Sequence, residues 1–200
     1  HFAIAAIFSF LDSPVQAARY LEKFAKNPEE DLGKNMLLVN MLAQLWHALG
    51  RSEQAIQYST RLLDLIDANL RKACERVQSS GSGKTIGEDW PEIVNRWEGR
   101  LAIANNSYAY YVARSESLKE RSAMAFERAE YAINWARGEA RKCSRSAPVS
   151  GQRREDLLNA FVDTYAYLIL AAEVDSKLPD QERMACTLFA FQAIRKQYLE

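Results

Sequence analysis

Three stretches of the sequence decide the fold, and each is centred on an alanine: LLVNMLAQLWHALG at residues 37–50, IANNSYAYYVARSE at 103–116 and AFVDTYAYLILAAE at 160–173. They align without gaps on Ala43, Ala109 and Ala166, and a bulky residue stands one position before and two positions after each alanine. A small residue at such a place lets a second helix approach closely, while its bulky neighbours fill the surrounding space. The pattern therefore predicts helices that pack against one another through the same kind of seam.

Glycine and proline separate long segments of the chain and do not interrupt them. There are eight glycines and five prolines in 200 residues, and apolar residues in the segments between them recur every three or four positions, as amphipathic helices require. Alternation with period two is absent over any useful length, so no strand is expected. The sequence predicts an all-α protein of about eight antiparallel helices in a single domain, with hairpins at about 1–26, 29–78, 90–143 and 153–198. Polar segments at 79–85 and 144–152 are predicted to be loops.

The composition of the chain limits the kinds of functional site that it can contain. The chain carries 26 basic and 26 acidic residues and is 48% hydrophobic, so it can bury a core without disulfides or metals. Cys74, Cys143 and Cys186 lie far apart without the spacing of zinc ligands, which favours a reducing, cytoplasmic setting and no metal or other cofactor. The apolar run at residues 2–11 is too short to span a membrane and is predicted to be a buried helix. No nucleophile accompanies His47, so we expect no enzyme activity.

The stretch from Met36 to about Asn69 resembles the tetratricopeptide repeat (TPR), in which a helix with a small eighth residue is followed by a turn and a helix opening on another alanine. The matching residues are Leu42, Ala43, Gly50, Ala55, Tyr58 and Leu62. Residues that fit equivalent positions of the repeat also occur earlier in the chain: Ala5, Asp12, Ala17, Tyr20, Leu21, Phe24 and Pro28. Later alanines are 66 and 57 residues apart instead of about 34, because the helices and loops are longer. The resemblance implies a right-handed α-α superhelix, here as a segment of a longer regulatory or sensor protein.

The resemblance also implies a concave groove that binds a peptide or a helix of another protein, or another domain of the same chain. The positions turned toward it would be Asn40, Gln44, His47, Asn106, Tyr110, Arg114, Asp163 and Tyr167. Within each helix they are three or four residues apart and share a face, and their donors and acceptors suit an extended backbone. They could equally bond to one another and to neighbouring helices. Only Arg114 is cationic, so capture of acidic C-terminal tails is not expected.

A protein-protein interaction or scaffold module is therefore the predicted function, and two other classes stay open. Arg137, Arg141, Lys142, Arg145, Arg153 and Arg154 form a basic stretch that could bind nucleic acid. The same stretch also suits the C-terminus of a helix and a solvated loop. A passive spacer or an oligomerisation surface is the other class. The segment Gly81–Thr85 ends like a nucleotide-binding loop but follows a helix and lacks the first glycine, so it is interpreted as a flexible connection.

Overall fold

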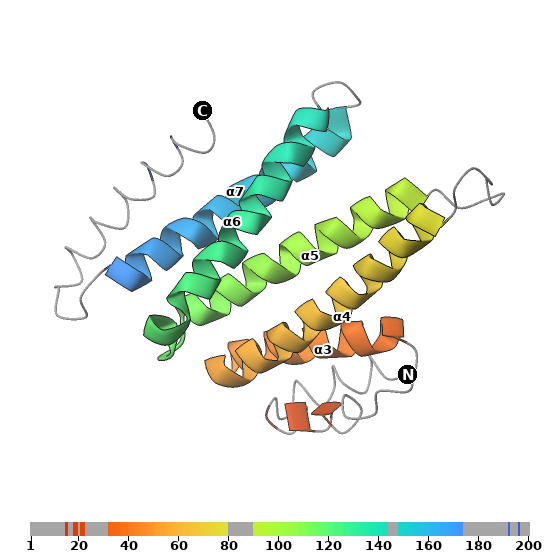
Figure 1. The fold of residues 1–200 in the computed structure, drawn as a ribbon. Coiled ribbons are helices and arrows are strands. Elements are labelled where there is room, and N and C mark those ends of the chain that lie inside the picture. Colours follow the sequence, from red (N-terminus) through yellow and green to blue (C-terminus); the bar gives the residue numbers. More distant parts are fainter. Residues whose placement is uncertain are drawn as a thin grey trace. The chain divides into compact units, whose positions relative to one another are not determined.

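The computed structural model is all-helical over the residues that it describes, which are 15, 18, 19, 21, 22, 32–79, 90–143, 148–173, 192 and 196. The helices with defined ends are α3 Leu32–Ala48, α4 Ser52–Ser79, α5 Trp90–Ala113, α6 Leu118–Cys143 and α7 Pro148–Glu173 (Figure 1). No strand occurs in these ranges, so the predicted all-α class is confirmed there. The count of about eight helices and the right-handed superhelix stay predictions.

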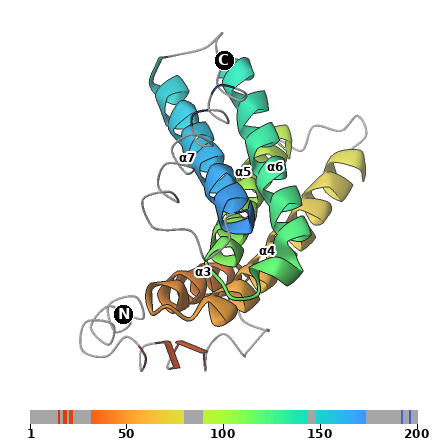
Figure 2. The ribbon, with the colours of Figure 1, turned by 90° about the vertical axis from the view of Figure 1, so that its left-hand side faces the viewer.

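The chain forms two compact units, residues 1–97 and 98–200, and α5 crosses the boundary between them. Within the first unit α3 packs against α4, and within the second α6 packs against α7, as Figures 1 and 2 both show. Helices α3 and α4 lie in the range expected for the hairpin at about 29–78, and α5 and α6 in that at about 90–143, while the division of the chain into hairpins stays a prediction. Most of residues 1–26, the segment 80–89 and most of 174–200 lie outside the described residues, as does the predicted connection at Gly81–Thr85.

The turn between α3 and α4 has the geometry that its glycine predicts. Gly50 has a φ of 70°, a left-handed conformation that glycine adopts without a steric penalty. Its N–H donates to the carbonyl of His47 at 2.9 Å, and the N–H of Arg51 donates to the carbonyl of Trp46 at 2.8 Å. These two bonds make the glycine-terminated helix end known as the Schellman motif.

The turn between α5 and α6 has no glycine, and serines close it instead. The Ser115 hydroxyl donates to the carbonyl of Val112 at 2.9 Å, while the N–H of Ser115 donates to the same carbonyl at 3.0 Å. The N–H of Arg121 then donates to the carbonyl of Ser117 at 3.1 Å. Side-chain and backbone donors thus satisfy carbonyls that the end of α5 would leave unpaired.

The start of α7 corrects the predicted loop at 144–152. The helix begins at Pro148, so residues 148–152 are helical, and only 144–147 of that segment lie outside the described residues. Proline is favoured at the first position of a helix because the N–H that it lacks has no intrahelical partner there. The small polar residues around it made the segment resemble a loop.

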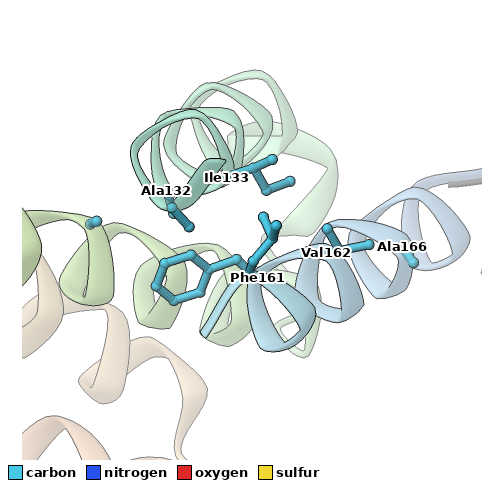
Figure 3. Close-up of a cluster of buried hydrophobic side chains, with 8 residues drawn as sticks. Ala132, Ile133, Phe161, Val162 and Ala166 are labelled. Atoms are coloured by element: carbon cyan, nitrogen blue, oxygen red, sulfur yellow. The ribbon is translucent and has the colours of Figure 1, made fainter. Parts of the chain in front are cut away.

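The core forms along the predicted seam. Ala43, Ala109 and Ala166 are all buried, at 1%, 0% and 0% exposure. In the second unit the core cluster joins Ala102 of α5 to α6 and α7, and Figure 3 shows Ala132 and Ile133 of α6 near Phe161 and Val162 of α7. The buried residues of α6 include a stripe of alanines that the sequence comparison did not single out, of which the last two belong to this cluster: Ala125, Ala129, Ala132 and Ala136. Their spacing places them on one face, which permits close helix approach.

Candidate functional site

An aromatic and cationic cluster lies on the second unit, formed by three of the predicted groove residues. The rings of Tyr110 on α5 and Tyr167 on α7 have centroids 6.1 Å apart and are tilted by 46°. The guanidinium carbon of Arg114 lies 5.6 Å from the Tyr110 centroid and 5.9 Å from that of Tyr167. Its Nη1 donates a hydrogen bond of 3.1 Å to the Tyr110 hydroxyl. We call Tyr110, Arg114 and Tyr167 the tyrosine–arginine cluster.

Helix periodicity explains how two neighbouring tyrosines take different roles. Tyr110 is in the last turn of α5 and Arg114 is the first residue after that helix, and the side chains of these two residues meet. The adjacent Tyr111 points into the core and is only 5% exposed. Burial, followed by the nearby Tyr110, raises the pKa of Tyr111 above its usual value, so its phenol stays neutral. The result is one buried tyrosine that anchors α5 and one that faces the cluster.

The cluster is open to solvent and carries a positive charge. Arg114 is exposed, Tyr110 is half-buried and Tyr167 is 38% exposed. A guanidinium above a tyrosine ring gains about 0.5–1 kcal/mol at an exposed site. Two such contacts and the hydrogen bond to Tyr110 restrain the Arg114 side chain while its charge remains at the surface.

Hydrogen bonds join α6 to both helices that carry the rings of this cluster, α5 and α7. The Tyr108 hydroxyl donates to the Met124 sulfur at 3.2 Å, and Arg128 Nη1 donates to Asn105 Oδ1 at 3.0 Å. Asn105 is 1% exposed, so this bond compensates for the burial of its amide. On the other flank the Tyr165 hydroxyl donates to Glu130 Oε1 at 3.1 Å. Spacing along one helix could not have indicated these partners.

The remaining predicted groove residues lie outside the cluster and differ in their exposure to solvent. Asp163 is exposed one turn before Tyr167 on α7, and therefore lies on the same face of that helix. Asn106 Oδ1 is buried and accepts no hydrogen bond within the described part of the chain, so it is not presented to a ligand in this conformation. Asn40, Gln44 and His47 are on α3 in the other unit, with Gln44 exposed and the other two half-buried. The structure does not relate these three to the cluster.

An apolar residue that sequence analysis left out adjoins the predicted set. Ile103 is 46% exposed and is two helical turns before Tyr110 on the same face of α5. A single exposed apolar side chain is common on protein surfaces, and Ile103 is relevant here because it shares a face of α5 with Tyr110. The sequence could have indicated Ile103, because it is one helical turn before Asn106 and so continues the spacing of the predicted groove positions.

The basic stretch at 137–154 is described only in part. Arg141 and Lys142 belong to α6, and Arg153 and Arg154 to α7, but of the six basic side chains only that of Arg137 is described, and it is half-buried. Arg145 lies outside the described residues. The nucleic-acid alternative therefore stays untested.

Metal sites and membrane-spanning helices can be assessed only for the residues that the structure describes. No group of three or more histidine, cysteine, aspartate or glutamate side chains within them is placed to hold a metal ion. None of the described helices is both long and apolar enough to cross a membrane.

Comparisons of the chain with protein-family models, with curated proteins and with solved structures found no match. The resemblance to tetratricopeptide repeats thus stays a prediction that rests on the residues quoted for it.

Proposed function

We propose that the chain is a non-catalytic protein-interaction module that binds a peptide or a helix of another protein. The binding face would include α5 and α7 of the second unit, with the tyrosine–arginine cluster at its centre. The observation that carries this proposal is the meeting of Tyr110, Arg114 and Tyr167 across two helices that are far apart in the sequence.

The composition of the cluster supports this role. Tyrosine and arginine are enriched among the residues that dominate binding energy at protein interfaces, because they combine apolar area with directional polar groups. Restraint of Arg114 by two rings and a hydrogen bond reduces the side-chain entropy that binding would otherwise remove. Ile103 extends the face with exposed apolar area.

The finer parts of the proposal follow from the resemblance. They are a right-handed superhelix, a concave groove that continues to Asn40, Gln44 and His47, a cytoplasmic setting and a place in a longer regulatory or sensor protein. The burial of Ala43, Ala109 and Ala166 is compatible with the repeat but is not specific to it.

A displayed peptide library tests the proposal without a known partner. Random twelve-residue peptides on phage are selected against the immobilised chain, and a selected peptide is titrated by fluorescence anisotropy. Tyr167→Ala should weaken its affinity by ~10-fold, a loss typical of an important interface residue. Tyr131→Ala is the matched control, because Tyr131 on α6 is also 38% exposed.

The outcomes separate the candidate functions. Equal affinities of the wild type, Tyr110→Ala and Tyr167→Ala for every selected peptide would show that the proposed face does not bind these peptides. Binding of single-stranded RNA that weakens steeply with salt would favour the nucleic-acid alternative.

A further inference from the structure

Met124 on α6 is the most exposed methionine in the part of the chain that the structure describes. Its side chain is 49% exposed, whereas Met36 and Met41 on α3 are half-buried. Met184 lies outside the described residues. Peroxides convert the thioether of an accessible methionine into a sulfoxide, and sulfoxide reductases reverse this change in cells. Among the described methionines, Met124 is therefore the one that an oxidant in solution reaches most readily.

A hydrogen bond covers part of the Met124 sulfur. The hydroxyl of Tyr108 on α5 donates to Met124 Sδ at 3.2 Å. Tyr108 is only 4% exposed, so packing restricts the position of its ring and of its hydroxyl. The hydroxyl therefore reaches the sulfur from the α5 side, while about half of the Met124 side chain stays open to solvent.

This arrangement makes the two sides of the sulfur unequal. A thioether sulfur has a lone pair on each side of the plane of its S–C bonds, and a lone pair can either accept a hydrogen bond or attack a peroxide. The lone pair that accepts from Tyr108 reacts only after the hydrogen bond breaks. Attack from one side or the other gives different epimers, because the sulfur of a sulfoxide is a stereocentre.

We propose that Met124 is a reversible oxidation site for hydrogen peroxide, and that Tyr108 directs the reaction to the side of the sulfur that faces away from α5. The lone pair on that side attacks one peroxide oxygen, so that an S–O bond forms and the O–O bond breaks. The proton of the attacked oxygen passes to the departing hydroxide, which leaves as water. The thioether is oxidised, the peroxide is reduced, and one sulfoxide epimer predominates.

The strength of the hydrogen bond sets the size of this preference. Attack on the covered side requires loss of the bond, and loss of one hydrogen bond slows a reaction about 2- to 10-fold. The epimer formed on the open side should therefore be in excess by about that factor. This modification is separate from the proposed binding of a peptide or helix and does not depend on it.

The test follows the oxidation of the whole, folded chain by hydrogen peroxide. After the reaction, trypsin cleaves behind Arg121 and Arg128 and releases the peptide 122–128, SAMAFER, in which Met124 is the only methionine. Mass spectrometry of this peptide over time gives the rate of oxidation. Treatment of the oxidised peptide with sulfoxide reductases specific for each epimer gives the epimer ratio.

The wild-type chain should show both selectivities. We expect Met124 to be oxidised faster than Met36 and Met41, which trypsin releases together in the peptide 35–51. The oxidised Met124 should contain one epimer in the excess given above. In the chain unfolded by guanidinium chloride this excess should disappear, because Tyr108 no longer covers one side of the sulfur.

Two variants assign the effect to the hydroxyl. Tyr108→Phe keeps the ring and removes the hydroxyl, so it should lower the excess toward equal amounts of both epimers. Tyr165→Phe is the matched control, because the Tyr165 hydroxyl also bonds to a residue of α6, Glu130, and its loss should leave the excess unchanged. Thermal unfolding of each variant verifies that it is folded.

Several results would overturn the proposal. Equal amounts of both epimers in the folded wild type would do so, as would an excess that persists in folded Tyr108→Phe or in the unfolded chain. Oxidation of Met124 no faster than that of the α3 methionines would show that it is not a preferred site. The proposed function survives all of these results, because neither Met124 nor Tyr108 belongs to the tyrosine–arginine cluster.

Discussion

Gly99 offers the sharpest test of the packing in the second unit. An added Cβ at Gly99 of α5 would lie 3.0 Å from Cζ2 and 3.2 Å from Cη2 of Trp135 on α6. The indole ring packs against the core cluster and is rigid, so it cannot retreat without disturbing that cluster. Gly138 of α6 is the matched control, because an added Cβ there meets nothing within 4 Å.

The two substitutions differ mainly in this contact. Each replaces a helical glycine by alanine, which by itself stabilises a helix by about 0.5–1 kcal/mol. Overpacking a core typically costs about 1–3 kcal/mol. Gly138→Ala should therefore raise the free energy of unfolding by the first amount, and Gly99→Ala should be about 1–3 kcal/mol less stable than Gly138→Ala.

Thermal and urea unfolding of the whole chain measure this difference. For a unit of this size, 1 kcal/mol corresponds to about 4–8 °C in Tm, so the two variants should melt at least ~4 °C apart. The reasoning also predicts rescue, because Trp135→Phe removes the ring that contains Cζ2 and Cη2. In that background Gly99→Ala should be neutral or stabilising. If Gly99→Ala raised Tm as much as Gly138→Ala in the wild-type chain, the close approach of α5 to α6 would be wrong.

Three further predictions concern other parts of the molecule. Burial and a hydrogen bond to Glu22 raise the pKa of Tyr58 from 10.0 to about 12, so the neutral phenol is favoured in the folded state. Its stabilising contribution should be complete below pH 10 and vanish as the pH rises toward 12. In urea unfolding at pH 8, 10 and 11 the advantage of the wild type over Tyr58→Phe should shrink, and a constant advantage would contradict the assignment. Gly50→Ala should lower the free energy of unfolding by about 1 kcal/mol because the φ of 70° is strained for alanine. Gly50→Asn should cost less, and equal losses would mean that φ is not the cause. Ala132→Leu should destabilise the second unit by about 1–3 kcal/mol, since Ala132 is 0% exposed in the core cluster. Ala123→Leu at an exposed position of the same helix should change Tm little, and similar effects of both would argue against the alanine stripe.

The candidate site was predicted in part from the sequence. The resemblance to the repeat selected Tyr110, Arg114 and Tyr167 as groove residues, and the structure brings these three side chains together. It also selected Asn106, whose Oδ1 proves to be buried, and it passed over the exposed Ile103. Whether an atom of a side chain is buried depends on the neighbouring helix, and the sequence pattern of α5 carries no information about that helix.

The sequence by itself determined the all-α class of the described residues and the turn at Gly50, and it misplaced the start of α7. Gly50 acts through its backbone geometry and through hydrogen bonds within a few residues, so its effect can be derived locally. Only the tertiary structure decided which side chains meet across helices. The contact of Gly99 with Trp135 and the stacking of Arg114 on Tyr167 join residues far apart in the chain. Such contacts depend on the separation of packed helices to within a few tenths of an ångström, which the side chains of three helices fix together.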